Sequence, residues 1–103
     1  MKTLIIAEGI VATGTVAQTA VGATATPFLA GRDTVCRVVP TGLTGTPTVK
    51  VQGSDDNATW TDLVTHTVLY EKQYNIKCAR YVRANQTVAG SAGTYSVYLD
   101  NGV

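Results

Sequence analysis

The sequence is short of charged side chains and of the residues that most often carry out chemistry. Asp, Glu, Lys and Arg together make up 15% of its 103 residues, well below the usual quarter. The chain has one histidine, two cysteines and one tryptophan, and its formal net charge is +1. No run of basic residues occurs, so neither nucleic acid nor a membrane surface is an expected partner. The shortage of charge instead indicates a surface of neutral polar groups, or one covered by neighbouring molecules.

This small inventory also argues against catalysis. His66 is the sole histidine and stands between Thr65 and Thr67, so we expect a solvent-facing strand residue rather than a general base. The patterns of a nucleophile elbow, a P-loop and a dinucleotide-binding loop are missing from the sequence. Asp55–Asn57 and Asp62 lack the alternate spacing of calcium ligands, and a hairpin turn is their expected use. The sequence therefore predicts a non-enzymatic protein with no metal and no cofactor.

Long apolar runs are also lacking. The apolar start at Leu4–Ile6 stops at Glu8 and Gly9, which is too short for the core of a secretory signal. We therefore expect a first strand there and synthesis in a cytoplasm. Nothing approaches the roughly 20 apolar residues of a membrane span. In a reducing compartment, Cys36 and Cys78 are expected to be buried free thiols, and a disulfide between two core strands is the alternative.

What the sequence has in quantity is Thr and Val, in short segments bounded by Gly, Pro, Asn and Asp. Roughly seven or eight short strands, with turn signals every eight to twelve residues, indicate an all-β, antiparallel β-sandwich of jelly-roll or Ig-like type. We expect a single domain over residues 1–103, with an extended N-terminal arm over residues 1–25 as an alternative. The expected strands are Lys2–Ala7, Ile10–Val21 (bent or divided), Thr34–Val39, Thr48–Gln52, Trp60–Val64, Thr67–Tyr70, Tyr74–Arg83 and Thr94–Leu99.

Breakers and polar segments predict where some of these strands end or bend. Pro40 should end the strand Thr34–Val39, since proline cannot donate to a ladder. A β-bulge within Tyr74–Arg83 should re-aim the chain near Arg80. The polar, Gly-containing stretch Asn85–Gly93 is expected to connect the last two strands.

The tyrosines and the tryptophan are candidates for contact with a partner. In the last strand, alternation with Val97 places Tyr95 inward and Tyr98 outward. Trp60 follows an acidic turn, where packing at the core or its rim is the main expectation and a stacking platform is the alternative. Aromatic and arginine side chains are enriched at protein interfaces. The predicted partner contacts are Trp60, Tyr81, Arg83 and Tyr98.

Three segments of the C-terminal half are similar, in their residues and their order, to segments of a known group of proteins. Val49–Leu63 reads VKVQGSDDNATWTDL, Ala79–Arg83 reads ARYVR, and Gly93–Leu99 reads GTYSVYL. In this order the segments resemble small β-sandwich proteins of tailed-bacteriophage virions. The resemblance implies a virion structural protein on the capsid surface, best described as a capsid decoration or cement protein. Its implied partners are the major capsid protein and copies of itself, as a homo-oligomeric trimer or dimer.

Two other functions remain open at this point. Discoidin-like carbohydrate-binding domains share the Trp60 turn and the strand that reads RYVR, although this chain is shorter than a full domain of that kind. The first alternative is therefore a carbohydrate- or host-surface-binding module of a phage fibre or spike. The second is a head–tail or tail component, which the sequence does not separate from a decoration protein.

Overall fold

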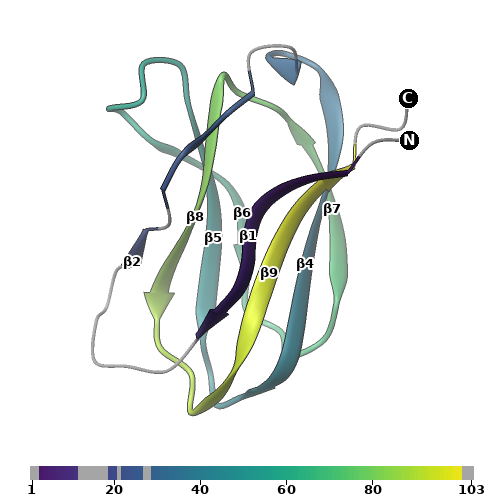
Figure 1. Cartoon of the computed structure of the whole chain (residues 1–103), viewed down its shortest axis with the longest axis vertical. Helices are drawn as coiled ribbons and strands as arrows, with labels where there is room; N and C mark the ends of the chain where they lie inside the picture. The colour runs from purple at the N-terminus through teal and green to yellow at the C-terminus, as the bar shows by residue number, and fades with distance from the viewer. Residues whose placement is uncertain (1–2, 12–18, 21, 27–28, 101–103) are drawn as a thin grey trace.

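The computed structural model describes residues 3–11, 19–20, 22–26 and 29–100, which form nine β-strands in two antiparallel sheets. One sheet has the order β1-β9-β4-β7, and the other has the order β2-β8-β5-β6 with β3 also paired to β8 (Figure 1). The predicted all-β, antiparallel sandwich is confirmed. Within these ranges, no helix is long and apolar enough to cross a membrane. The strands are β1 (Thr3–Val11), β2 (Thr19–Ala20), β3 (Thr24–Ala25), β4 (Asp33–Thr44), β5 (Thr48–Ser54), β6 (Thr61–His66), β7 (Lys72–Lys77), β8 (Tyr81–Val88) and β9 (Ala92–Asp100).

The strand pairs are nested like one long hairpin that has been rolled up. β1 pairs with β9, β2 and β3 pair with β8, β4 pairs with β7, and β5 pairs with β6. Rolling this hairpin creates two further pairs, β4 with β9 and β5 with β8, and these join the strands into two layers. If β2 and β3 count as two parts of one interrupted strand, eight strands form two four-stranded sheets. This is the jelly-roll arrangement, and it decides between the two predicted types of sandwich.

The core lies between the two sheets and follows the side-chain alternation of each strand. In β9, Tyr95, Val97 and Leu99 are 0%, 0% and 1% exposed, as their alternation predicted. The other buried hydrophobic residues are Ile6, Ala7, Leu29, Cys36, Val38, Leu43, Val49, Val51, Val64, Ile76, Cys78, Val82 and Ala84. Both layers therefore contribute their inner faces to one cluster.

The strands described within the first 25 residues all pair with other strands of this chain. β1 lies beside β9, while β2 and β3 lie beside β8, so these strands find their partners in this chain's own sheets. The predicted end of the first strand at Ala7, before Glu8 and Gly9, is wrong, because β1 continues to Val11. Gly9 has a φ of 61°, and the register shifts between Ile5 and Ile10, so a bulge absorbs the interruption. Most of the predicted segment Ile10–Val21 lies outside the described residues.

The predicted strand end at Pro40 is also wrong, since β4 runs on to Thr44. The pairing of β4 with β7 stops at Val38, whereas its pairing with β9 continues past Pro40. Pro40 therefore has a neighbouring strand on one side only. A proline without an N–H is tolerated in that position.

The predicted strand Tyr74–Arg83 is instead divided between the two sheets, with its first part in β7 and its last part in β8. Between them, the carbonyls of Ala79 and Arg80 accept hydrogen bonds from the Thr26 hydroxyl at 2.7 Å and the Thr26 N–H at 2.6 Å. In a bulged strand these two carbonyls would lie within a β-ladder, but here they bond to Thr26, which lies in a loop. The chain therefore crosses from one layer to the other here, and no bulge is needed.

Two other boundaries differ from prediction. Thr67–Tyr70 is not a strand but belongs to the connection between β6 and β7, the edge strands of the two sheets. The predicted connection Asn85–Gly93 is too long at both ends, because β8 continues to Val88 and β9 begins at Ala92. Polar composition made the end of β8 resemble a loop, but pairing with β5 keeps it in the sheet.

Both cysteines are free thiols in the core, as predicted. Cys36 is 0% exposed and Cys78 is 3% exposed. Burial raises the pKa of Cys36 to about 12, and the neighbouring Cys78 contributes to the rise. Burial raises the pKa of Cys78 as well. A thiolate is the reactive form, so both groups should be inert in the folded protein.

We expect neither cysteine of the folded protein to react with Ellman's reagent at pH 8 on the time scale of mixing, because both sulfurs are buried and protonated. In guanidinium chloride both should react at once. A thiol that reacts rapidly without denaturant would contradict the buried positions of Cys36 and Cys78.

Gly93 offers a test of the close approach between β9 and β4. Its φ is +95°, and a Cβ added there would collide with the carbonyl oxygen of Gly42. Gly31 is a matched control, because its φ is +77° but a Cβ there would meet nothing within 4 Å. We expect Gly31→Ala to cost about 1–2 kcal/mol for its backbone conformation, and Gly93→Ala to cost about 1–3 kcal/mol more for the collision. Urea unfolding measures both, and equal losses would contradict the close approach.

Candidate functional site

Three of the four predicted partner contacts lie together on one outer face, that of the β2-β8-β5-β6 sheet. Tyr81 and Arg83 flank Val82 in β8, and Val82 is 0% exposed, so both point outward and are half-buried. Trp60 directly precedes β6, and the centroid of its ring is 4.2 Å from Cζ of Arg83. Tyr98 lies instead on the outer face of the other sheet. The structure thus brings Trp60, Tyr81 and Arg83 onto one surface and separates them from Tyr98.

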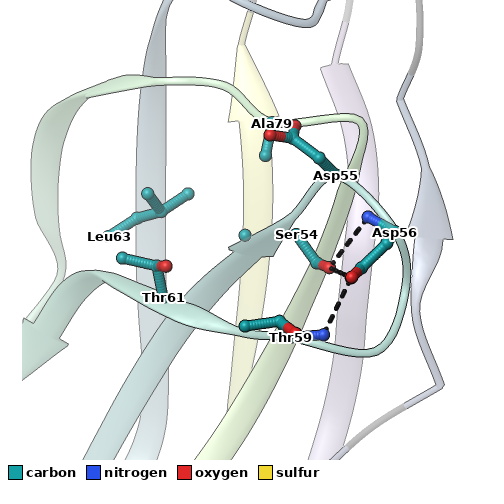
Figure 2. Close-up of a pocket in the computed structure, with 8 residues that line it drawn as sticks. Ser54, Asp55, Asp56, Thr59, Thr61, Leu63 and Ala79 are labelled. Atoms are coloured by element: carbon teal, nitrogen blue, oxygen red, sulfur yellow. Dashed lines mark hydrogen bonds between the residues drawn. The ribbon is translucent and has the colours of Figure 1, made fainter.

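The turn between β5 and β6 places Trp60 at this face. Asp56 accepts hydrogen bonds from the Thr59 N–H at 2.8 Å and from the Ser54 hydroxyl at 2.9 Å (Figure 2), and also from the Ala58 N–H at 2.9 Å. These bonds lower the pKa of Asp56 to about 2. Asn57 completes the turn with a φ of 60°, a conformation that asparagine tolerates. The predicted hairpin turn is confirmed, and Asp56 is its central acceptor.

An open hollow of about 490 Å³ lies beside this turn (Figure 2). Its lining residues are Gly53, Ser54, Asp55, Asp56, Thr59, Thr61, Leu63 and Ala79. The packing beside this hollow requires glycine at position 53, because a Cβ there would lie 2.8 Å from Ala79 Cβ. Ser54 and Asp56 are already bonded within the turn. In the part of the chain that the structure describes, no three metal-ligating side chains converge, here or elsewhere.

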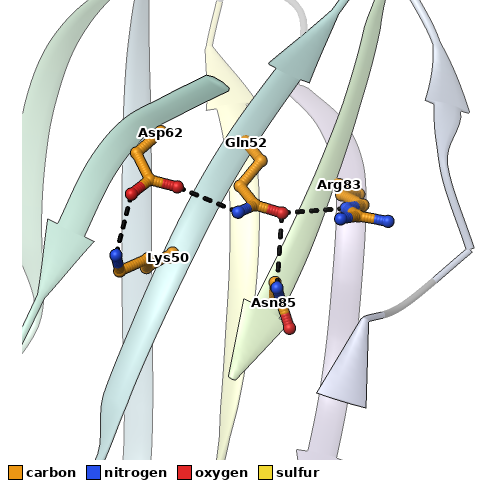
Figure 3. Close-up of polar contacts among 5 residues, drawn as sticks. All are labelled: Lys50, Gln52, Asp62, Arg83 and Asn85. Atoms are coloured by element: carbon orange, nitrogen blue, oxygen red, sulfur yellow. Dashed lines mark hydrogen bonds and ion pairs between the residues drawn. The ribbon is translucent and has the colours of Figure 1, made fainter. Parts of the chain in front are cut away.

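A ladder of polar side chains crosses the same outer face (Figure 3). Lys50 Nζ donates to Asp62 Oδ2 at 2.8 Å, and Gln52 Nε2 donates to Asp62 Oδ1 at 2.9 Å. The other end of the Gln52 amide, Oε1, accepts from Arg83 Nε at 2.9 Å and from Asn85 Nδ2 at 3.4 Å. The bonds from Lys50 and Gln52 lower the pKa of Asp62. Because these four hydrogen bonds link the five side chains, the ladder holds them in fixed orientations.

Register explains why these side chains meet. Gln52 in β5 stands opposite Asp62 in β6 and Arg83 in β8, and residues directly opposite in antiparallel strands share a face. Most of the hairpin of β5 and β6 lies in Val49–Leu63, the first of the three segments that resemble virion proteins. The start of β8 lies in the second segment, Ala79–Arg83. Sequence reasoning missed Gln52 and Lys50, although the predicted hairpin could have paired them with Asp62.

The opposite outer face carries a second arginine–aromatic pair. Cζ of Arg37 is 4.7 Å from the centroid of the Tyr98 ring, and Arg37 Nε is 3.2 Å from Asp100 Oδ2. Asp100 also accepts a hydrogen bond from the Thr3 hydroxyl at 2.8 Å. Ile5 stands opposite Tyr98 in the register and is 51% exposed. Tyr98 therefore faces outward as predicted, in a surface where the arginine already has a carboxylate partner.

His66 is buried, which contradicts its predicted position in solvent. It is 1% exposed and alternates with the buried Val64, so both belong to the inner face of β6. Its Nδ1 lies 2.7 Å from the hydroxyl oxygen of Tyr74 in β7, and the two rings meet edge to face. The prediction was based on the flanking Thr65 and Thr67. Alternation with Val64 was the signal that pointed inward.

Burial lowers the pKa of His66, with a hydrogen bond from its ring to the Val68 backbone opposing the shift and the charge of Lys72 adding to it. The folded pKa is thus below the unfolded value of about 6.5. Between these two values the unfolded chain binds more protons, so stability is complete above about pH 6.5 and is lost as the pH falls toward the folded pKa.

We therefore expect the free energy of unfolding in urea to fall between pH 7 and pH 5.5, by at most about 1.4 kcal/mol per pH unit from this group. A His66→Leu variant should lose this part of the pH dependence, because leucine has no proton to bind. A wild-type profile that matches that of His66→Leu over this range would contradict the buried, neutral histidine.

The fold and its surfaces define the chain as a jelly-roll domain with a preorganised arginine–aromatic pair on each outer face. No protein-family model matches the chain, and no curated protein matches it.

Proposed function

We propose that this chain is a non-enzymatic structural protein of a bacteriophage virion, and specifically a decoration protein. It binds the surface of the assembled head and ties neighbouring capsomers together. Its partners are the major capsid protein and copies of itself, as a trimer or dimer, after synthesis in the host cytoplasm. Support comes from the three segments with the style of virion proteins, and from a fold that recurs in capsid and lectin domains. A fold alone does not assign a function, so the proposal rests mainly on the two outer surfaces.

The observation that carries this proposal is the presence of an arginine–aromatic pair on each of the two outer faces. Trp60 with Arg83 lies on one face, and Tyr98 with Arg37 lies on the other. A protein that ties two neighbours together needs two contact surfaces, and these residue types dominate interface energetics. The arginine of each pair is already held by a hydrogen bond, so it has little side-chain freedom to lose on binding.

The surface of Trp60 weighs against a carbohydrate-binding module. A sugar ring packs on an open face of an aromatic ring, but Arg83 covers one face of the Trp60 indole. The remaining groups of the ladder, Lys50, Asp62 and Gln52, are bonded to one another. A sugar would have to displace these bonds before it could use their hydrogen-bonding groups.

Co-sedimentation with undecorated phage heads tests the proposal. We expect saturable binding of the purified protein at micromolar concentration, and Tyr98→Ala should weaken it about tenfold, as loss of an interface aromatic does. Tyr70→Ala is the matched control, because Tyr70 is 63% exposed in the β6–β7 connection and lies on neither face. This variant should bind like the wild type.

Absence of binding to heads at micromolar concentration would contradict the proposed function. Binding to purified tails but not to heads would assign the chain to the tail instead. Sedimentation equilibrium of the protein alone measures the expected trimer or dimer. A monomer at all concentrations would remove self-association from the proposal.

A further inference from the structure

Among the residues that the structure describes, Arg83 is a cation without an anionic partner. All seven acidic residues of the sequence lie among the described residues, and the ion pairs that they form there involve Arg37, Lys50 and Lys77. Within that part of the chain, Arg83 itself contacts the neutral Gln52 through a hydrogen bond and the Trp60 ring by stacking. Arg83 is also half-buried, unlike the exposed Arg32 and Arg80. A partly desolvated guanidinium gains more from a carboxylate than an exposed one does.

The two arginine–aromatic pairs of the molecule differ in one component. Arg37 stacks on Tyr98 and has a carboxylate, Asp100, at 3.2 Å. Arg83 stacks on Trp60, but the position equivalent to that carboxylate is taken by the amide oxygen of Gln52. In the first pair, the positive charge of Arg37 is balanced by the carboxylate of Asp100. In the second pair, the positive charge of Arg83 faces a neutral amide.

The rest of the ladder is unable to supply that charge. It contains two cations, Lys50 and Arg83, and one anion, Asp62. Both oxygens of Asp62 are occupied, one by Lys50 and the other by Gln52. The ladder therefore ends at Arg83 with a net positive charge, and no acidic side chain of the described residues balances it.

The geometry leaves one edge of the guanidinium for such an anion. Nε donates to Gln52 Oε1 at 2.9 Å, and the plane is stacked on Trp60, which together fix the orientation of the group. Figure 3 shows the guanidinium extending beyond this bond, away from the ladder. Two terminal amino groups at that edge match the two oxygens of a carboxylate in a pair of parallel hydrogen bonds.

We propose that Arg83 is a receptor for the carboxylate of an acidic side chain on a partner protein. Gln52 and Trp60 hold the guanidinium in place, and the Trp60 ring keeps water from one side of it. The identification of the partner as a protein rests on the proposed function, whereas the carboxylate chemistry rests on Arg83 and its neighbours alone. Docking of such a side chain completes the charge balance of the ladder.

NMR with two short peptides tests the carboxylate chemistry directly. One peptide has Glu-Glu between glycines, and the other has Gln-Gln in the same place. At low salt, the ¹H–¹⁵N signal of Arg83 Nε should shift saturably with the glutamate peptide and stay unchanged with the glutamine peptide. The Nε signal of Arg37, which already has Asp100, should shift far less. Added salt should reverse the shift of Arg83.

Variants of Arg83 separate the contribution of its two paired N–H donors from the contribution of its positive charge. Arg83→Gln should abolish saturable binding of the glutamate peptide, and Arg83→Lys should weaken it severalfold, because lysine keeps the charge but loses the paired donors. Arg80→Gln is the matched control, since Arg80 is exposed and lies outside the ladder. It should leave the response of Arg83 unchanged. With phage heads, Arg83→Gln should reduce affinity about tenfold or more, and Arg80→Gln by less than about twofold.

Failure of this inference is distinguishable from failure of the proposed function. An Arg83 signal that ignores the glutamate peptide overturns the inference, whether or not the protein binds heads. A positive peptide response without binding to heads contradicts the decoration role and leaves the carboxylate receptor in place. Saturation of Arg83 by glucuronate at much lower concentration than by the peptide would overturn the protein partner in favour of an acidic sugar.

Discussion

Two sheets whose inner faces carry Val, Leu and Tyr side chains are stable in water only when each covers the other, and this mutual burial is the constraint on which the rest of the molecule depends. It fixes which side of every strand faces inward, so Tyr95 of one layer and Val82 of the other are both fully buried. It also brings together strands that are far apart in the sequence. β9 lies between β1 and β4, and β8 lies between β5 and the pair of β2 and β3. Each central strand of the C-terminal half is flanked mainly by strands from the first half.

The outer faces follow from the same alternation, because each strand has only two sides. On one sheet the outward positions form a polar ladder that ends in Arg83, and on the other they form a surface of Ile5, Tyr98 and Arg37. The scarcity of charge in the sequence gains a structural meaning here. Most charges on these faces are paired or stacked, so the surfaces are nearly neutral and rigid. Such surfaces suit contacts with other proteins better than diffusional capture of a highly charged ligand.

Alternation was the most reliable guide from the sequence, and breakers were the least reliable. Tyr95 and Tyr98 were assigned to their correct sides because period two survives in any sheet. Gly9 and Pro40 were expected to end strands, but a bulge and a one-sided strand pairing accommodate them. The four partner candidates were chosen by residue type and by their local position in a strand or turn. Their division between two faces could not be predicted, because it depends on which layer each strand joins.

By itself, then, the sequence determined the all-β class, the approximate number of strands and the inward positions of the clearest of them, since these depend on local alternation and turn chemistry. Only the tertiary structure decided the jelly-roll pairing, because an antiparallel strand can satisfy its hydrogen bonds with many neighbours and only the joint burial of all strands selects one set. The same holds for the electrostatics. The sequence contains eight basic and seven acidic residues, but which of them meet is a property of the fold. That Arg37 has a carboxylate while Arg83 has none follows from cross-strand register, which places Asp100 beside the first and Gln52 beside the second.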